Sequence, residues 1–473
     1  MKITNSNIFD FARDPFLRFD IDNVTMRKGL PISESARLSE YITFIETGKP
    51  ITRDDYSMSV TENIHLLVRN IVDGDIDYAN LVYINDEKAD ELTAFRADDG
   101  DIILAISANC GAACLFASVT DLKVTLSHYL CRIKVDTARI LPQYLVYYLN
   151  TNMMKSYFRG VETGKGQQNL SKVYVKQAPV IVPDTDIQKR IIESVSSIEA
   201  SISSLKSRIL PVQNIIDSVF ANEFSFDFTR FNELKKESVI TADISSFANN
   251  PDLRFSAKFH REAATFVMSQ LQGITSKKIK DFISEPIVLG ASVSPNDYSD
   301  DGDKFYISMA TIKNWCFDSE DAKTVFERYF DTKQTKTVSK NDILMARSGE
   351  GTIGKVALID NDEVQGVFAD FTMRIRLKNY NAKFAYYYLR CSYFQYLVEV
   401  YKKGLGNNTN IFPSTIQEFP IPDISTQEQE RIVAAIQNII DGQEEIKMQI
   451  SQKREEINII IERVLTHEPK ECV

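Results

Sequence analysis

The chain has 473 residues, 44% of them hydrophobic and 25% charged, with a formal net charge of −10. Its length exceeds what one hydrophobic core usually supports, so at least two domains are expected. No apolar run of about 18 residues occurs and the N-terminus lacks the apolar core of a signal peptide, so we expect a cytoplasmic protein without a membrane span. The negative charge argues mildly against a protein that coats a polyanion by itself.

The chain repeats itself. Four short segments return in the same order, displaced by 236, 242, 241 and 240 residues when their first residue numbers are subtracted. Matches at a nearly constant offset indicate two copies of one domain, and a duplicated site suits a ligand that is itself in two parts. The matches are 14–19 (DPFLRF) with 250–255 (NPDLRF), 54–57 (DDYS) with 296–299 (NDYS), 100–107 (GDIILAIS) with 341–348 (NDILMARS), and 164–170 (GKGQQNL) with 404–411 (GLGNNTNI).

Each copy has the same predicted order of elements, which indicates an α+β fold. A short strand precedes a longer apolar strand, and a helix rich in aromatic residues follows, with Pro142 in its first turn in the first copy. A glycine-rich loop and a short run ending in proline come next. The expected ranges in the two copies are 64–68 and 304–308, 102–106 and 343–346, 142–149 and 383–389, and 180–183 and 419–422.

Each copy closes with a long amphipathic helix, expected over residues 186–222 and 425–467. Apolar residues recur every three to four positions along both helices, which is the heptad period of a coiled coil. Pro211 is expected to interrupt the first helix and to kink it. Each helix could bury its apolar stripe on its own domain, but the stripes are longer than one small domain would cover. We therefore expect the two helices to pair as an antiparallel coiled coil with pseudo-twofold symmetry.

Signals for metal binding, nucleotide binding and catalysis are weak. Cys110 and Cys114 lack a second pair and the histidines are scattered, so no metal site is predicted. Residues 349–355 (GEGTIGK) have no Ser or Thr after Lys355 and lie between two strands, which predicts a hairpin rather than a phosphate loop. Residues 14–16 and 250–252 lack the second proline of an adenine-methylation loop, so no catalytic residue is predicted. The six cysteines have no disulfide spacing and are expected to be reduced.

A basic, amide-rich stretch in each copy is the candidate nucleic-acid site. Residues 153–176 carry five Lys or Arg against one Glu, and residues 372–403 carry seven against one. Lys and Arg suit phosphates, Asn and Gln can pair with adenine in the major groove, and glycines allow close approach. The alternative is a turn whose amides cap backbone groups beside a solvated charged face. The candidate DNA-binding residues are Arg159, Lys165, Gln167, Gln168, Asn169, Lys172, Arg347, Lys402, Lys403, Asn407, Asn408, Thr409 and Asn410.

The chain resembles the specificity (S) subunits of type I restriction–modification enzymes. The resemblance rests on the tandem halves, on the loop at 404–411, and on a phrase that leads from a proline through Gln188 and Ile191 into the first long helix. The same phrase returns with Pro422, Gln429 and Ile432. The first copy departs from the family pattern in its loop, 164–168 (GKGQQ), and in Pro211.

The resemblance implies a non-catalytic protein in which each domain reads one half of a split double-stranded DNA target. The paired helices would act as a ruler for the unread spacer and dock two adenine-methyltransferase subunits, which motor-nuclease restriction subunits join. S-adenosylmethionine, ATP and magnesium would belong to those partners, with no cofactor in this chain. The implied boundaries are 1–185 and 250–424 for the target-recognition domains, 186–222 and 425–467 for the spacer helices, and 223–249 for a linker.

Two other functions are consistent with the same residues. One is a scaffold whose duplicated domains bind protein partners, which the net charge of −10 favours. The other is the specificity subunit of a related bipartite restriction system. An adjacent adenine-methyltransferase gene would support the type I assignment, and its absence would favour the scaffold.

Overall fold

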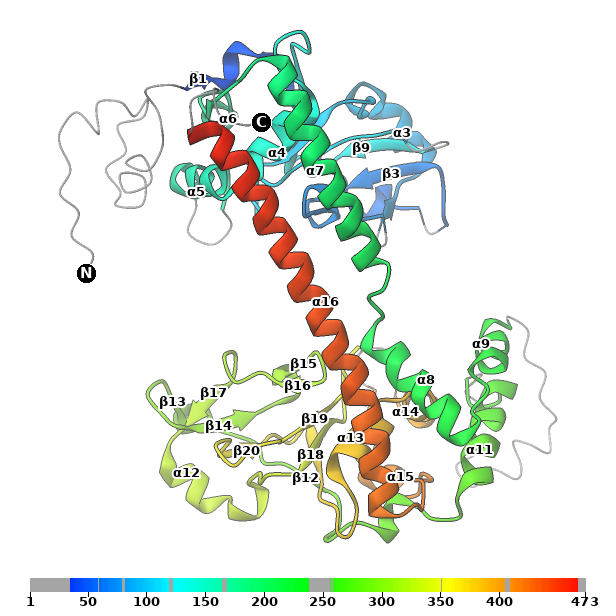
Figure 1. Ribbon diagram of the computed structural model, residues 1–473. Helices are drawn as coiled ribbons and strands as arrows, with labels where there is room; N and C mark the ends of the chain where they lie inside the picture. The colour runs from blue at the N-terminus through cyan, green and yellow to red at the C-terminus, as the bar shows by residue number, and fades with distance from the viewer. Residues whose placement is uncertain are drawn as a thin grey trace. The chain divides into compact units, whose positions relative to one another are not determined.

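The structure is a computed structural model that describes residues 35–57, 59–78, 81–118, 122–163, 168–237, 256, 258–349, 351–404 and 409–466 (Figure 1). The repeated segments at 14–19 and 250–255 lie outside these residues. The chain divides into two compact units. Unit 1 comprises Met1–Arg208 and Met448–Val473, and unit 2 comprises Ile209–Lys447.

Unit 1 is built around a central strand that is buried on both faces. This strand, β7 (Ile102–Ala105), belongs to a four-stranded antiparallel sheet of order β2-β10-β7-β8. Ile102 and Leu104 join the helix-covered core, whereas Ile103 and Ala105 face a core shared with a three-stranded sheet of order β6-β3-β9. The other strands are β2 (Ile42–Thr47), β10 (Leu130–Val135), β8 (Ala113–Leu115), β6 (Val82–Tyr83), β3 (Asn63–Leu66) and β9 (Lys123–Leu126).

Unit 2 repeats this arrangement. Its central strand, β18 (Ile343–Ala346), lies in a sheet of order β12-β21-β18-β19 and also divides its side chains between two cores. A second sheet has the order β13-β17-β14-β20, in which β14 and β20 are parallel, as β3 and β9 are in unit 1. These strands are β12 (Val288–Leu289), β21 (Thr372–Ile375), β19 (Val356–Leu358), β13 (Tyr298–Ser299), β17 (Lys323–Val325), β14 (Lys304–Ile307) and β20 (Gly366–Phe368).

The predicted strands and aromatic helices are confirmed, and residues 349–355 join β18 to β19 in an antiparallel hairpin, as expected. The aromatic helices are α4 (Pro142–Leu149), with Pro142 in its first turn, and α13 (Ala382–Arg390). Their large side chains are buried because each helix covers the central sheet of its unit. The remaining helices are α3 (Asp86–Glu91), α5 (Asn152–Val161), α6 (Lys172–Lys176), α9 (Phe228–Lys236), α11 (Glu262–Ile274), α12 (Glu327–Thr332), α14 (Ser392–Tyr401) and α15 (Pro413–Gln417), and short strand pairs are β1 (Ala36–Arg37) with β11 (Pro179–Val180), β4 (Ile71–Val72) with β5 (Asp75–Ile76), and β15 (Ile312–Lys313) with β16 (Cys316–Phe317).

The first spacer helix was expected over 186–222, with Pro211 interrupting and kinking it. The interruption is confirmed, but it separates two helices instead of bending one. The segment consists of α7 (Thr185–Lys206) and α8 (Val212–Phe224), with an interruption over 207–211. Pro211 has no N–H to donate and restricts the residue before it to an extended conformation, so the helix stops and restarts instead of bending. The second spacer helix, α16 (Thr426–Thr466), is continuous over 41 residues.

The spacer helices pair in antiparallel fashion inside each unit. In unit 1, Ile191 near the start of α7 shares a core with Ile461 near the end of α16. In unit 2, the backbone N–H of Leu210, just before α8, donates to Gln443 at 2.8 Å, and Glu223 near the end of α8 pairs with Arg431 in the second turn of α16. The α+β fold with tandem domains and paired helices is therefore confirmed.

Residues 223–249 were expected to be a linker, and their described part is not one. This part contains α9, in which Phe231 and Leu234 are buried in the core of unit 2. The segment 226–236 is therefore part of the second domain, and its apolar residues at 228, 231 and 234 follow the spacing of a packed helix.

The described residues contain no group of His, Cys, Asp and Glu side chains that could hold a metal ion. None of their helices is both long and apolar enough to cross a bilayer. The five described cysteines are free thiols, and burial raises the pKa of Cys114 and Cys131 to about 12, so both thiols stay protonated at neutral pH.

Candidate nucleic-acid interface

The glycine-rich loop of each copy is closed at its base by paired backbone hydrogen bonds. Thr163 and Asn169 exchange N–H···O bonds of 2.9 and 2.8 Å, and Lys403 and Asn410 exchange bonds of 2.8 and 2.7 Å. These residue pairs form the same closed neck in both units, at the two ends of each loop.

Each neck is fastened to the end of the central strand. In unit 1, the Ser107 hydroxyl donates to the Gln168 carbonyl at 3.1 Å and the Leu170 N–H donates to the Ile106 carbonyl. In unit 2, the Ser348 hydroxyl donates to the Thr409 carbonyl, also at 3.1 Å, and the Ile411 N–H donates to the Arg347 carbonyl. The sequence repeat thus corresponds to one duplicated set of hydrogen bonds that attaches the loop neck to the central strand, here called the loop mount.

The candidate residues other than Arg347 and Asn410 fall into three groups. Lys165, Gln167, Asn407 and Asn408 lie outside the described residues. Arg159 on α5, Lys172 at the start of α6 and Lys403 at the neck are exposed, as is Asn169, whereas Gln168 is half-buried. Thr409 is 5% exposed and Lys402 donates to Glu399 at 2.7 Å, so both support the loop rather than present a free side chain.

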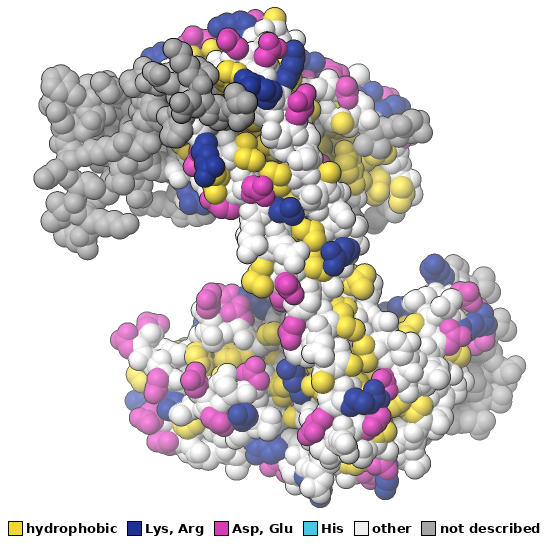
Figure 2. All heavy atoms as spheres, in the orientation of Figure 1, with side chains coloured by type: hydrophobic (Ala, Val, Ile, Leu, Met, Phe, Trp, Pro, Cys, Tyr) yellow, Lys and Arg dark blue, Asp and Glu magenta, His cyan; other side chains and the backbone are white. Residues whose placement is uncertain are grey.

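Much of the basic character of residues 372–403 is used inside unit 2, which corrects the impression given by the charge count. Arg374 is buried and donates to Glu285 at 2.6 Å and to two backbone carbonyls. Arg376 pairs with Asp342, and Arg390 donates to the Tyr386 hydroxyl at 2.6 Å. On the face shown in Figure 2, Lys and Arg side chains alternate with Asp and Glu and do not form one basic surface.

Arg347 is the candidate whose surroundings are most elaborate. Its Nε and Nη2 atoms donate to the side-chain oxygen of Asn410 at 3.3 and 3.1 Å. Its guanidinium carbon lies 5.9 Å from the ring centroid of Phe371 and 5.7 Å from that of Phe412. Both rings are exposed, at 47% and 39%. The sequence prediction missed these two phenylalanines, although Phe412 directly follows the loop.

The equivalent place in unit 1 has different side chains. Hydrogen bonding defines the equivalence, because the Ile106 N–H donates to the Tyr129 carbonyl just as the Arg347 N–H donates to that of Phe371. Ile106 therefore replaces Arg347, Tyr129 replaces Phe371, and Ser171 replaces Phe412 as the residue after the neck. The Tyr129 ring packs at 3.8 Å from the ring of His128.

The glutamine of the closing phrase fastens each spacer helix to its domain. Gln188 is fully buried, accepts from the Leu141 N–H at 2.8 Å, and donates to the carbonyls of Arg139 and Pro183. Gln429 likewise accepts from the Asn381 N–H at 2.7 Å and donates to the Ile424 carbonyl. The two N–H groups belong to the N-caps of α4 and α13, so the glutamine joins spacer helix and aromatic helix.

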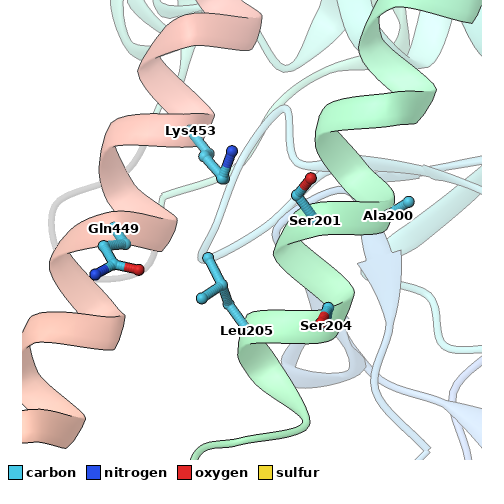
Figure 3. A pocket seen from close by; sticks show the side chains of 6 residues that line it. All are labelled: Ala200, Ser201, Ser204, Leu205, Gln449 and Lys453. Carbon is cyan, nitrogen blue, oxygen red and sulfur yellow. The ribbon is translucent and has the colours of Figure 1, made fainter.

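A shallow hollow of about 470 Å³ lies between α7 and α16 within unit 1. Figure 3 shows Leu205 and Lys453 pointing into the gap between the two helices. The hollow is open to solvent and has one charged side chain, so its lining does not define a ligand. It is lined by Ala200, Ser201, Ser204, Leu205, Gln449 and Lys453.

A duplicated α+β domain with a mounted loop, followed each time by a spacer helix, is the architecture of a two-part recognition protein. The family model of the type I restriction modification DNA specificity domain matches the chain over residues 67–212 and again over 271–456. These ranges cover more than half of the chain and include one loop mount each. The chain therefore belongs to the type I restriction–modification DNA specificity family.

Individual relatives are distant. The specificity subunit of the type I restriction enzyme EcoEI from Escherichia coli is 26% identical over 124 residues, which is 25% of this chain and only 21% of that protein. Solved structures with a similar fold include the S subunit from M. genitalium, with 12% identity and a TM-score of 0.39, and the HsdS subunit from Thermoanaerobacter tengcongensis, with 14% and 0.32. Each covers 90% of this chain and 95% of the other. These values are too low to carry a functional argument, so the assignment rests on the family model.

Proposed function

We propose that this chain is the non-catalytic DNA-specificity subunit of a type I restriction–modification complex, and that each domain reads one half of a bipartite double-stranded DNA target. The observation that carries the proposal is the loop mount, which recurs with the same bonds inside both matches to the specificity family. Two equivalent sites in one polypeptide suit a target with two separate halves.

The loops and their neighbours would supply the DNA contacts. Arg159, Lys172 and Lys403 are exposed beside the necks and suit phosphate groups, whose contacts fix the register of a protein on the duplex. The amides of the loops, Gln167, Asn169, Asn407 and Asn408, suit adenine edges in the major groove. Lys165 and Arg347 complete the set, with Gln168, Lys402, Thr409 and Asn410 in the necks that hold the loops.

The spacer helices would hold the two readers apart and dock the partners. Two adenine-methyltransferase subunits would bind the paired helices, and motor-nuclease subunits would join them for restriction. S-adenosylmethionine, ATP and magnesium would be bound by those partners. Large apolar side chains that stay exposed on α16, namely Ile439, Met448 and Ile459, support a docking role for this helix.

Co-expression with the methyltransferase subunits, followed by sequencing of methylated adenines, tests the proposal. We expect a split motif with two fixed halves and an unread spacer of constant length. Two outcomes would favour the protein-binding scaffold. In the first, the protein binds its partners but the genome stays unmethylated; in the second, the genome is methylated at sites that share no split motif. The net charge of −10 and the mixed surface charge are the observations that favour that alternative. A split motif with a differently composed nuclease would indicate a related bipartite system.

A further inference from the structure

We infer that Arg347 reads a guanine in the half-site of the second domain. This inference rests on the proposed function and goes further, because it assigns one side chain to one kind of base. Arg347 directly follows β18; its backbone carbonyl accepts from the N–H of Ile411, and its guanidinium carbon lies 5.9 Å from the ring centroid of Phe371 and 5.7 Å from that of Phe412. It is therefore at the root of the loop that would enter the DNA groove.

The guanidinium is held by Asn410 before any DNA arrives. The side-chain oxygen of Asn410 accepts from Nε and Nη2, which leaves Nη1 outside these bonds, and the rings of Phe371 and Phe412 both lie within 5.9 Å of the guanidinium carbon. An arginine has five N–H donors in a rigid fork. The bond to Asn410 uses the Nε edge, so the two terminal nitrogens can still donate together from the opposite end. Preorganisation of this kind reduces the entropy lost on binding.

Guanine is the base that fits such a fork. Its major-groove edge carries two adjacent acceptors, O6 and N7, whereas adenine pairs an acceptor with an amino donor, thymine has one acceptor beside a methyl group, and cytosine has a donor. Two adjacent N–H donors can therefore both be accepted only by guanine. On each of the other bases at least one of the two donors faces a donor, a methyl group or no acceptor. The groups that hold Arg347 are an amide oxygen and two rings, all uncharged, so they leave its positive charge to favour the DNA.

The exposed phenylalanines also fit a reading site. Phe371 and Phe412 are both exposed near this cation, and aromatic and arginine side chains are enriched where a protein surface meets a partner. A base pair docked on Arg347 would cover both rings and remove water from the new hydrogen bonds, which strengthens them. Unit 1 has Ile106, Tyr129 and Ser171 at these positions and no donor fork. We therefore expect no guanine contact of this kind in the half-site of the first domain.

The test uses the whole complex and three variants. Wild-type complex should require a guanine at one position of the half-site read by the second domain. R347A should lower the methylation preference for guanine at that position on the order of 10- to 100-fold and leave the other half-site unchanged. R347K keeps the charge and can still donate to guanine but has no planar fork, so it should lower the preference less than R347A does. Lys378→Ala removes an exposed charge of the same basic segment and should leave the motif unchanged.

A base analogue tests the same contact on the DNA side. Replacing the guanine by 7-deazaguanine removes the N7 acceptor, so the wild-type complex should bind roughly ten-fold more weakly while R347A should bind both duplexes alike. The analogue needs no altered protein, so a variant that fails to assemble does not prevent the test. A guanine preference that survives R347A would overturn the inference, because another residue would then read that base, as would a second half-site without a fixed guanine. Weaker binding of R347A with an unchanged preference for guanine would mean a phosphate contact, since phosphates carry no sequence information. Absence of any split motif in the wild type would instead overturn the proposed function.

Discussion

The two units share a fold and the hydrogen bonds that hold the loop necks and spacer helices. They differ in the side chains beside the necks. Ser107 and Ser348 hold the two necks, and Gln188 and Gln429 hold the two spacer helices, through equivalent partners, except that Gln188 donates to one more carbonyl than Gln429 does. Beside the necks, however, Ile106 in one unit stands where Arg347 stands in the other. The shared backbone and its hydrogen bonds determine where the DNA-contacting surface of each domain would lie. The side chains that differ between the domains would determine which bases that surface recognises.

Two glycines show how strictly the shared fold is kept. A Cβ atom on Gly48 would lie 2.0 Å from the Leu126 carbonyl oxygen, and one on Gly290 would lie 1.9 Å from that of Phe368. In both units a backbone segment crosses too close for any side chain. Such positions cannot vary, whereas Ile106 and Arg347 are only half-buried and can.

The largest effect should come from exchanging a whole domain. If each unit reads independently, replacing the second domain with that of another family member should change all of one half-site and none of the other. Methylated adenines in cells that express the chimaera, mapped by sequencing, provide the measurement. A change in both halves, or in neither, would contradict independent reading.

The structure improves the design of that exchange. A replacement of residues 236–424 would cut at the last residue of α9 and leave Phe231 and Leu234 facing a foreign core, because both belong to the core of unit 2. An exchange of 225–424 moves α9 with its core, and the shorter exchange serves as the matched comparison. We expect the longer one to yield more folded complex with the same new half-site.

Changing the spacer helices should shift the spacer and leave both half-sites intact. A heptad inserted between Ile198 and Leu205 lengthens α7 by about 10 Å, or up to roughly three base pairs of B-form DNA. Because α7 pairs with the unbroken α16, a second heptad is needed between Gln449 and Lys453, opposite Leu205. The methylation motif gives the spacer length directly.

The control is an insertion of two residues at the same site in α7. It turns the following apolar residues by about 200° and exposes Leu205, so less methyltransferase should co-purify. Equal tolerance of both insertions with an unchanged spacer would mean that the helices neither pair nor measure.

The sequence was sufficient to predict the duplicated α+β domain, its central strands, the aromatic helices and the hairpin after β18, because apolar periodicity and turn residues determine these locally. It overstated the basic surface, since a charge count cannot show that Arg374 is buried against Glu285. It missed Phe371, which reaches Arg347 only through strand pairing between β18 and β21. It located the interruption at Pro211 but assigned the residues of α9 to a linker, because tertiary packing decides whether a short segment folds.

Removing the buried glutamines should destabilise each unit separately. Gln188→Ala leaves one N–H and two carbonyls without partners and should lower the free energy of unfolding by about 3 kcal/mol, whereas Gln429→Ala leaves one N–H and one carbonyl and should lower it by about 2 kcal/mol. Trp315 is the single tryptophan and packs in unit 2, so its fluorescence during urea unfolding reports that unit. Only Gln429→Ala should move the fluorescence transition; an equal shift from Gln188→Ala would show that the units unfold together.

The smallest expected effect concerns the side chain that caps a helix N-terminus in each unit. The cap is an asparagine in unit 1 and an aspartate in unit 2. Asn458 of α16 accepts from the N–H of Asn152, the first residue of α5, at 2.8 Å. Asp217 of α8 accepts from the N–H of Ser392, the first residue of α14, also at 2.8 Å. Both cap a helix N-terminus, but one cap is neutral and the other is a carboxylate. Desolvation by burial raises the pKa of Asp217 above its ordinary value of 3.8.

Asp217→Asn should therefore stabilise unit 2 slightly at neutral pH, by roughly 0.5 kcal/mol, because asparagine keeps the cap and removes a buried charge. A raised pKa means that the native state binds the proton more tightly than the unfolded state. The wild type consequently gains stability as the pH falls through the native pKa toward 3.8, and the advantage of the variant shrinks over the same interval. Urea unfolding of both proteins at about pH 7 and about pH 5 measures this difference. Asn458→Asp is the reverse exchange in unit 1. It should lower the free energy of unfolding by a similar amount at neutral pH, with the same pH dependence, because it buries a carboxylate. If the variant were as stable as the wild type at neutral pH, solvent would reach this cap and burial would not be the difference between the two caps.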